Sequence, residues 1–149
     1  MKKSVLVDGE GGPLAAVLAG ANVPDFRLLA ATLDAIVPAR PAPTPAAPQE
    51  LYGDRAYDHW TCDEAGAARG STLRIARLGG GWVREGAPPP PEPPQYRARR
   101  WIVERTLAWL SKCRGLLVRY EKKASNHLGF LMVACSLLWY RRAVRNRDS

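Results

Sequence analysis

The chain has 149 residues, of which 46% are hydrophobic and 24% are charged. This is the length of one ordinary domain, and the composition argues against wholesale disorder. The longest apolar run, residues 128–140, is interrupted by Gly129 and Ser136 and is shorter than the roughly 20 residues that a membrane span needs. The apolar stretch after the first two lysines ends at Asp8, too soon for a signal peptide. Three cysteines are too few for a disulfide scaffold, and their odd number favours a reducing cytoplasm.

The charge is unevenly distributed along the chain. The formal net charge is +8, yet residues 95–149 hold thirteen Lys or Arg against three acids, while residues 1–94 hold nine basic and eleven acidic residues. A cationic C-terminal third on a slightly acidic body predicts contact with a polyanion, of which nucleic acid is the most plausible. The alternative is a solvated basic surface.

The first block, residues 1–37, is predicted to form a hairpin and a helix. Two short apolar runs, residues 4–7 and 14–18, are separated by a glycine-rich turn, which is the signature of a hairpin. Asp25 is placed to cap a following helix whose apolar positions are Leu28, Leu29, Leu33, Ile36 and Val37.

Two proline clusters divide the rest of the chain. Five of the eleven residues 38–48 and six of the seven residues 88–94 are proline, so residues 38–49 and 88–94 are interpreted as linkers. Residues 50–87 lie between them, with a strand expected at 50–53, a helix near 63–69 and a strand at 72–78. Residues 50–87 are expected to form one segment.

The last block, residues 95–149, is predicted to be helical and basic. Residues 97–117 contain no proline, and their apolar residues recur at spacings of three, four and seven. A second helix is expected at about 128–144, capped by Ser125 or Asn126. Its C-terminal arginines also suit the helix dipole.

Few residues carry an obvious chemical role. His59 and Cys62 are three apart and could start a metal site, but no second pair follows at zinc-finger spacing. Cys113 and Cys135 fall among apolar helical positions and are expected to fill the core. Asp54 follows a strand, which favours an exposed carboxylate. Glu104 is a lone acid on a basic helix, where it is either an ion-pair partner of Arg100 or a metal ligand beside phosphate.

Three stretches together resemble one known family. Residues 100–110 read RWIVERTLAWL and are continued by Arg114, Leu117, Arg119, Tyr120 and Glu121; residues 53–58 read GDRAYD. Residues 6–36 supply a further matching segment in the same order. These motifs resemble the C-terminal portion of the catalytic domain in bacterial insertion-sequence DDE transposases with the VERT motif.

The resemblance implies an α/β, RNase-H-like fold, in which a mixed sheet is flanked by helices and the catalytic acids gather at one edge. Here that fold is expected to be incomplete at its N-terminus and to end in two helices. Asp54 corresponds to the second catalytic aspartate and Glu104 to the closing glutamate, and together they would ligate two Mg²⁺ or Mn²⁺ ions. The residues expected to bind DNA phosphates are Arg100, Arg105, Lys112, Arg114 and Arg119.

The resemblance also implies that one acid is missing. The first catalytic aspartate should lie upstream of the hairpin, and Asp8 is not its equivalent; we expect Asp8 to cap the turn. The chain alone is therefore expected to be inactive unless a separate N-terminal half completes it. DNA is the expected partner, an oligomer is plausible, and no membrane is involved; the expected location is the bacterial cytoplasm, at the nucleoid. Two alternatives stay open: a non-enzymatic basic DNA-binding module, or a remnant without a stable fold.

Overall fold

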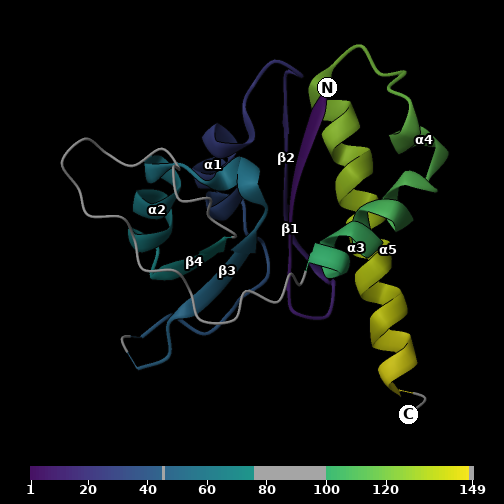
Figure 1. The fold of residues 1–149 in the computed structure, drawn as a ribbon. Helices are drawn as coiled ribbons and strands as arrows, with labels where there is room; N and C mark the ends of the chain where they lie inside the picture. Colours follow the sequence, from purple (N-terminus) through teal and green to yellow (C-terminus); the bar gives the residue numbers. More distant parts are fainter. Residues whose placement is uncertain (45, 76–99, 148–149) are drawn as a thin grey trace.

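The computed structural model describes residues 1–44, 46–75 and 100–147, except for the side chain of Arg100. The described elements make a mixed α/β fold (Figure 1). In chain order these elements are β1 (Lys2–Val7), β2 (Pro13–Ala19), η1 (Asp25–Leu28), α1 (Leu29–Asp34), β3 (Gln49–Gly53), η2 (Arg55–Tyr57), α2 (Trp60–Ala67), β4 (Ser71–Ile75), α3 (Arg100–Ser111), α4 (Arg114–Leu117) and α5 (Ala124–Arg147).

The predicted hairpin is confirmed. Strands β1 and β2 pair antiparallel, with Lys2 opposite Ala19 and Leu6 opposite Ala15, and the register shifts after Leu6. The turn is closed by the Asp8 N–H, which donates to the Gly12 carbonyl at 2.8 Å. Small residues on β2 suit its position, because Ala15 and Ala16 are buried beneath the helices.

The strands predicted at residues 50–53 and 72–78 also form, although residues 76–78 lie outside the described residues. Their pairing with each other was not predicted. Strands β3 and β4 are parallel, in register from Gln49 opposite Ser71 to Gly53 opposite Ile75, and α2 provides the crossover that parallel neighbours require. Within the described residues the four strands make two separate two-stranded ladders. The single mixed sheet that the sequence led us to expect is therefore not formed by these strands alone.

The cap predicted for the first helix is wrong. The residue before η1 is Pro24, which has no side chain able to cap, and Asp25 is the first residue of that turn. The Asp25 carboxylate instead pairs with Lys2 Nζ at 3.2 Å. A long-range ion pair thus replaces the local cap, and it ties η1 to the start of β1. The linker at residues 38–49 contains an isolated bridge between Thr44 and Ala47, and the linker at 88–94 lies outside the described residues.

The helix expected at residues 97–117 is interrupted. Its described part, α3, ends at Ser111, and the N–H groups of Lys112 and Cys113 bond to the carbonyls three residues back, at 3.0 and 3.1 Å. This tightened turn lets the chain change direction, so that Leu116 on α4 is buried against α5. Helix α5 begins at Ala124, which places Ser125 and Asn126 inside its first turn and rules out the cap that the sequence suggested.

Two apolar clusters hold these elements together. The larger joins Ala16 of β2 to α3, α4 and α5 and includes the buried Leu131 and Cys135; Cys113 packs against it. The smaller joins α1 and α2 around Leu29, Leu33 and Cys62. The prediction that Cys113 and Cys135 fill the core is confirmed. Of the described helices, none combines the length and apolar character needed to cross a lipid bilayer.

Candidate catalytic and nucleic-acid site

Asp54 lies directly after β3, as the sequence predicts, and its side chain is exposed. It caps η2, because its Oδ1 accepts the Ala56 N–H at 2.8 Å. Tyr57, three residues later, packs against the smaller apolar cluster. Burial raises the pKa of the Tyr57 phenol, against the opposing effect of a hydrogen bond with Ser4. The turn that follows β3 is thus anchored by Tyr57, which leaves the Asp54 carboxylate at the surface.

Glu104 lies on the outer side of α3. The inner side of this helix is defined by Ile102, Thr106 and Leu110, which are all buried and recur every four residues. Glu104 is two positions from both Ile102 and Thr106, so the helical repeat turns it away from the buried side, and it is exposed. No described side chain pairs with it. Its predicted partner Arg100 has a side chain outside the described residues.

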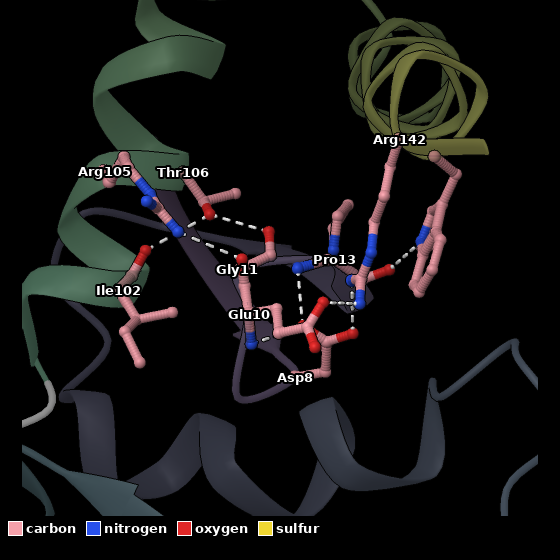
Figure 2. A network of polar contacts seen from close by, with 10 residues as sticks. Asp8, Glu10, Gly11, Pro13, Ile102, Arg105, Thr106 and Arg142 are labelled. Atoms are coloured by element: carbon pink, nitrogen blue, oxygen red, sulfur yellow. Dashed lines mark hydrogen bonds and ion pairs between the residues drawn. The ribbon is translucent and has the colours of Figure 1, made fainter. Parts of the chain in front are cut away.

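The rotation of α3 is set by the hairpin turn. Figure 2 shows Thr106 and Arg105 of α3 reaching the turn between β1 and β2. Thr106 Oγ1 donates to the Gly11 carbonyl at 2.8 Å, and Arg105 Nη2 donates to the Glu10 carbonyl at 3.1 Å. Gly11 has a φ of +91°, and a Cβ there would lie 3.0 Å from Thr106 Oγ1. Glycine is required at this position by both its backbone conformation and the closeness of the helix.

The same turn also binds α5 (Figure 2). Arg142 Nη1 donates to Asp8 Oδ2 at 2.7 Å, and Arg142 Nη2 pairs with the Glu10 carboxylate. The indole N–H of Trp139 donates to the Pro13 carbonyl at 2.7 Å. One turn therefore positions two helices that lie about a hundred or more residues further along the chain.

Asp8 is the centre of this network. Its Oδ1 accepts the N–H groups of Glu10 and Gly12, at 2.9 and 2.7 Å, so the expected role in the turn is confirmed. Burial acts to raise the pKa of Asp8, but these two N–H groups and the Arg142 guanidinium outweigh it and lower that pKa. The sequence contains no local signal for the Arg142 contact, because the two residues are 134 positions apart.

The predicted phosphate-binding residues are in different situations. Arg105 lies over the ring of Trp101, 4.9 Å from its centroid, as well as bonding to Glu10. Arg119 is occupied by its own loop, where it donates to the carbonyls of Glu121 and Lys122 at 2.7 and 2.6 Å. Lys112 and Arg114 are exposed, and no described group pairs with them. Among the four predicted residues whose side chains the structure describes, these last two are thus the most available.

The described residues do not assemble a metal centre by themselves. No hydrogen bond or ion pair connects Asp54 to Glu104, and the described part of the chain holds no group of three or more His, Cys, Asp or Glu close enough to bind an ion. His59 Nδ1 instead caps α2, accepting the Thr61 N–H at 3.2 Å, and Cys62 donates to the Phe26 carbonyl. Carboxylates suit Mg²⁺, but two isolated ones do not make a site for it.

Comparison with known proteins decides the family. The profile of the family described as "Transposase DDE domain" matches residues 1–139. The chain belongs to this family. A relative from Burkholderia cepacia, named as the proposed transposase for insertion sequence element IS402, is 36% identical over 154 aligned residues that include 99% of this chain. This DDE transposase chain spans 66% of that relative's length. No solved structure matched it.

Proposed function

We propose that this chain is the part of a DDE-type transposase that cleaves phosphodiester bonds of DNA and transfers the strands. The observation that carries the proposal is that the family match runs continuously through both predicted acids, Asp54 and Glu104. Both carboxylates are exposed on ordered supports, one after β3 and the other on α3. This supports their assignment as the second and the closing catalytic acids.

The proposed chemistry depends on a divalent cation, Mg²⁺ or Mn²⁺. Two such ions, when bound, would stabilise the attacking and the leaving oxygen of the displacement. The chain's own contribution would be the oxygen ligands of Asp54 and Glu104. Arg100, Arg105, Lys112, Arg114 and Arg119 would bind and orient the DNA phosphates. Of the four whose side chains are described, Lys112 and Arg114 are the two that are exposed and have no described partner.

We propose that these 149 residues carry two of the three catalytic acids and are inactive without a further segment. The two strand ladders support this view, since β1 and β3 each pair along one edge within the described residues. A strand that brings the first aspartate would join the ladders into one RNase-H-like sheet. Such a segment would correspond to the part of the Burkholderia relative that this chain does not cover. Because the proposed substrate is DNA, the protein would act at the bacterial nucleoid.

A second candidate function is a basic DNA-binding module without catalysis. It is favoured by the concentration of charge in residues 95–149, with thirteen basic and three acidic residues. In this case Glu104 would have no chemical role, and its charge would only reduce DNA binding slightly.

Manganese titration followed by cleavage of transposon-end DNA distinguishes the two functions. Calorimetry on the chain supplied with the uncovered segment of the relative should show Mn²⁺ binding that Asp54→Ala and Glu104→Gln each abolish. The same mixture should nick the DNA only when Mg²⁺ or Mn²⁺ is present, and both variants should fall to the uncatalysed background.

The control is DNA affinity, which Glu104→Gln should leave salt-dependent and undiminished. Metal binding and cleavage that survive both substitutions would refute the catalytic assignment. A chain that binds DNA but neither binds Mn²⁺ nor nicks, although circular dichroism shows it folded, would favour the binding module.

A further inference from the structure

The end of α4 and the loop that follows it expose three large apolar side chains. Leu117, Val118 and Tyr120 are 67%, 51% and 80% exposed, and we call these three residues the apolar tip. Figure 1 shows the loop, residues 118–123, at the edge of the molecule between α4 and the first turn of α5. Large apolar side chains that gather at the surface of a protein mark a binding surface, whereas single ones need no explanation.

Internal bonds hold this loop in one shape. Arg119 donates from Nε to the Glu121 carbonyl at 2.7 Å and from Nη2 to the Lys122 carbonyl at 2.6 Å. Glu121 Oε2 lies 3.0 Å from His127 Nδ1, and these two side chains are only 14% and 3% exposed. Tyr120 therefore lies between two residues that are bonded to the protein, while its own ring is in solvent. A ring presented by a pre-organised loop loses less conformational freedom when it binds.

The charge around the apolar tip selects its ligand. Residues 112–123 hold five Lys or Arg against one acid, and that acid, Glu121, faces His127. All five cations are exposed; they are Lys112, Arg114, Arg119, Lys122 and Lys123. Lysine is depleted in interfaces between proteins, whereas lysine and arginine are the residues that neutralise the phosphates of nucleic acids. The charge therefore favours DNA over a second protein as the ligand of the tip.

We propose that the apolar tip binds an unstacked base of DNA, with the Tyr120 ring stacked on the face of that base. The exposed cations of residues 112–123 would hold the flanking phosphates. Because every base has an aromatic face, such a site prefers opened base pairs over any particular sequence. The inference rests on the proposed DNA binding and adds a preference that phosphate contacts alone do not supply. It is independent of the catalytic assignment, because neither Asp54 nor Glu104 takes part in it.

Fluorescence anisotropy of the full 149-residue chain with a pair of labelled duplexes tests the site. The duplexes share one sequence, except that one of them carries adjacent T·T mismatches, whose bases leave the stack at less cost. The wild type should bind the mismatched duplex more tightly than the perfect one at the same salt concentration. Tyr120→Ala should weaken binding to the mismatched duplex about 5- to 100-fold, which is the usual contribution of base stacking on an aromatic ring. Binding to the perfect duplex should change less than about twofold, because the cations remain.

Tyr140→Ala is the matched control, because Tyr140 is a tyrosine of similar exposure, 66%, that lies on α5 outside the loop. It should leave the preference for the mismatched duplex unchanged, and so should Tyr120→Phe, which keeps the ring. Circular dichroism should show all three variants folded. A wild type that binds both duplexes equally, or equal losses in the two alanine variants, would overturn the inference, and the tip would then be a contact for a protein. Failure of the proposed function would differ, since neither duplex would then show salt-dependent binding.

Photo-cross-linking identifies the residue that contacts the base. In the mismatched duplex, 5-iodouracil replaces one unpaired thymine; light breaks its carbon–iodine bond and joins the uracil ring to an aromatic side chain stacked on it. Mass spectrometry should locate the cross-link at Tyr120, and Tyr120→Ala should abolish this product. Trp101 is also exposed, by 57%, so a cross-link at Trp101 in place of Tyr120 would contradict the inference.

Discussion

At the scale of single residues, Asp8 connects the turn of the hairpin to the last helix. Its Oδ1 accepts hydrogen bonds from two backbone N–H groups of the turn. Its Oδ2 accepts a hydrogen bond of 2.7 Å from Arg142 Nη1. A carboxylate in this position favours its charged form, and its pKa is lowered although burial opposes the change. The folded chain therefore holds Asp8 more strongly as an anion than the unfolded chain does.

Replacing Asp8 by Asn should reduce stability in a manner that depends on pH. Because the folded pKa lies below the unfolded value of 3.8, the stabilisation is complete above about pH 4 and is lost as the pH falls through the folded pKa. We expect Asp8→Asn to lower the free energy of unfolding by about 1 kcal/mol at pH 7, since solvent screens a pair in which Asp8 is 26% exposed. The difference from the wild type should shrink below pH 4.

Urea denaturation at pH 7, 5 and 3 measures both the loss of stability at neutral pH and its decrease at low pH. Glu104→Gln is the control, because it removes an acid that has no partner among the described side chains, and it should change stability by less than about 0.5 kcal/mol. A constant difference between Asp8→Asn and the wild type at all three pH values would show that the charge of Asp8 contributes nothing.

At the scale of the elements, α3 and α5 are positioned by contacts rather than by their own helical tendency. Helix α3 is fixed through Thr106 and Arg105 to the turn, and α5 through Arg142 and Trp139 to the same turn. Apolar burial then adds the larger share of the energy through the cluster around Leu131. Glu104 faces outward because both the turn and the core hold the other side of α3.

The two faces of α5 should respond differently to truncation. Leu131 is fully buried, so Leu131→Ala should lower the free energy of unfolding by about 2–5 kcal/mol, because it removes buried apolar atoms and leaves a cavity. Val133 on the opposite side of α5 is 68% exposed, so Val133→Ala should cost less than about 0.5 kcal/mol. Denaturant titration followed by tryptophan fluorescence compares the two variants, and similar losses would contradict the assignment of inner and outer faces.

At the scale of the whole molecule, the basic residues are concentrated in the part of the chain that holds α3, α4 and α5. Lys112 and Arg114 flank the break between α3 and α4 and are exposed. DNA binding through such residues releases counterions, so its affinity falls with salt in proportion to the number of phosphates that the protein neutralises.

Substituting both Lys112 and Arg114 by Gln should therefore weaken DNA binding and flatten its salt dependence. We expect the slope of log K against log salt to decrease by up to about 1.8, which is about 0.9 for each phosphate that is no longer neutralised. Fluorescence anisotropy with a labelled duplex at four salt concentrations measures it. The control is Arg27→Gln with Arg40→Gln, two exposed cations outside this region; an equal change in both double variants would argue against a localised DNA surface.

The local elements, the uneven charge and the family could all be inferred from the amino-acid order alone. The hairpin, both strands of the parallel pair and the main helices follow from turn chemistry and apolar spacing, which involve residues only a few positions apart. The motifs around Asp54 and Glu104 were enough to indicate the DDE family, which the comparison then established.

Contacts between distant residues required the folded structure. The ion pair of Asp25 with Lys2, the end of α3 at Ser111 and the Arg142 contact with Asp8 all differ from, or lie beyond, the local expectation. The two ion pairs form because folding brings together groups that no short-range pattern relates. Helix α3 instead ends through local hydrogen bonds to carbonyls three residues back, a turn that allows Leu116 to be buried against α5. The hairpin turn thus positions two helices. No short stretch of sequence indicates this role, because Asp8 and Arg142 are 134 positions apart.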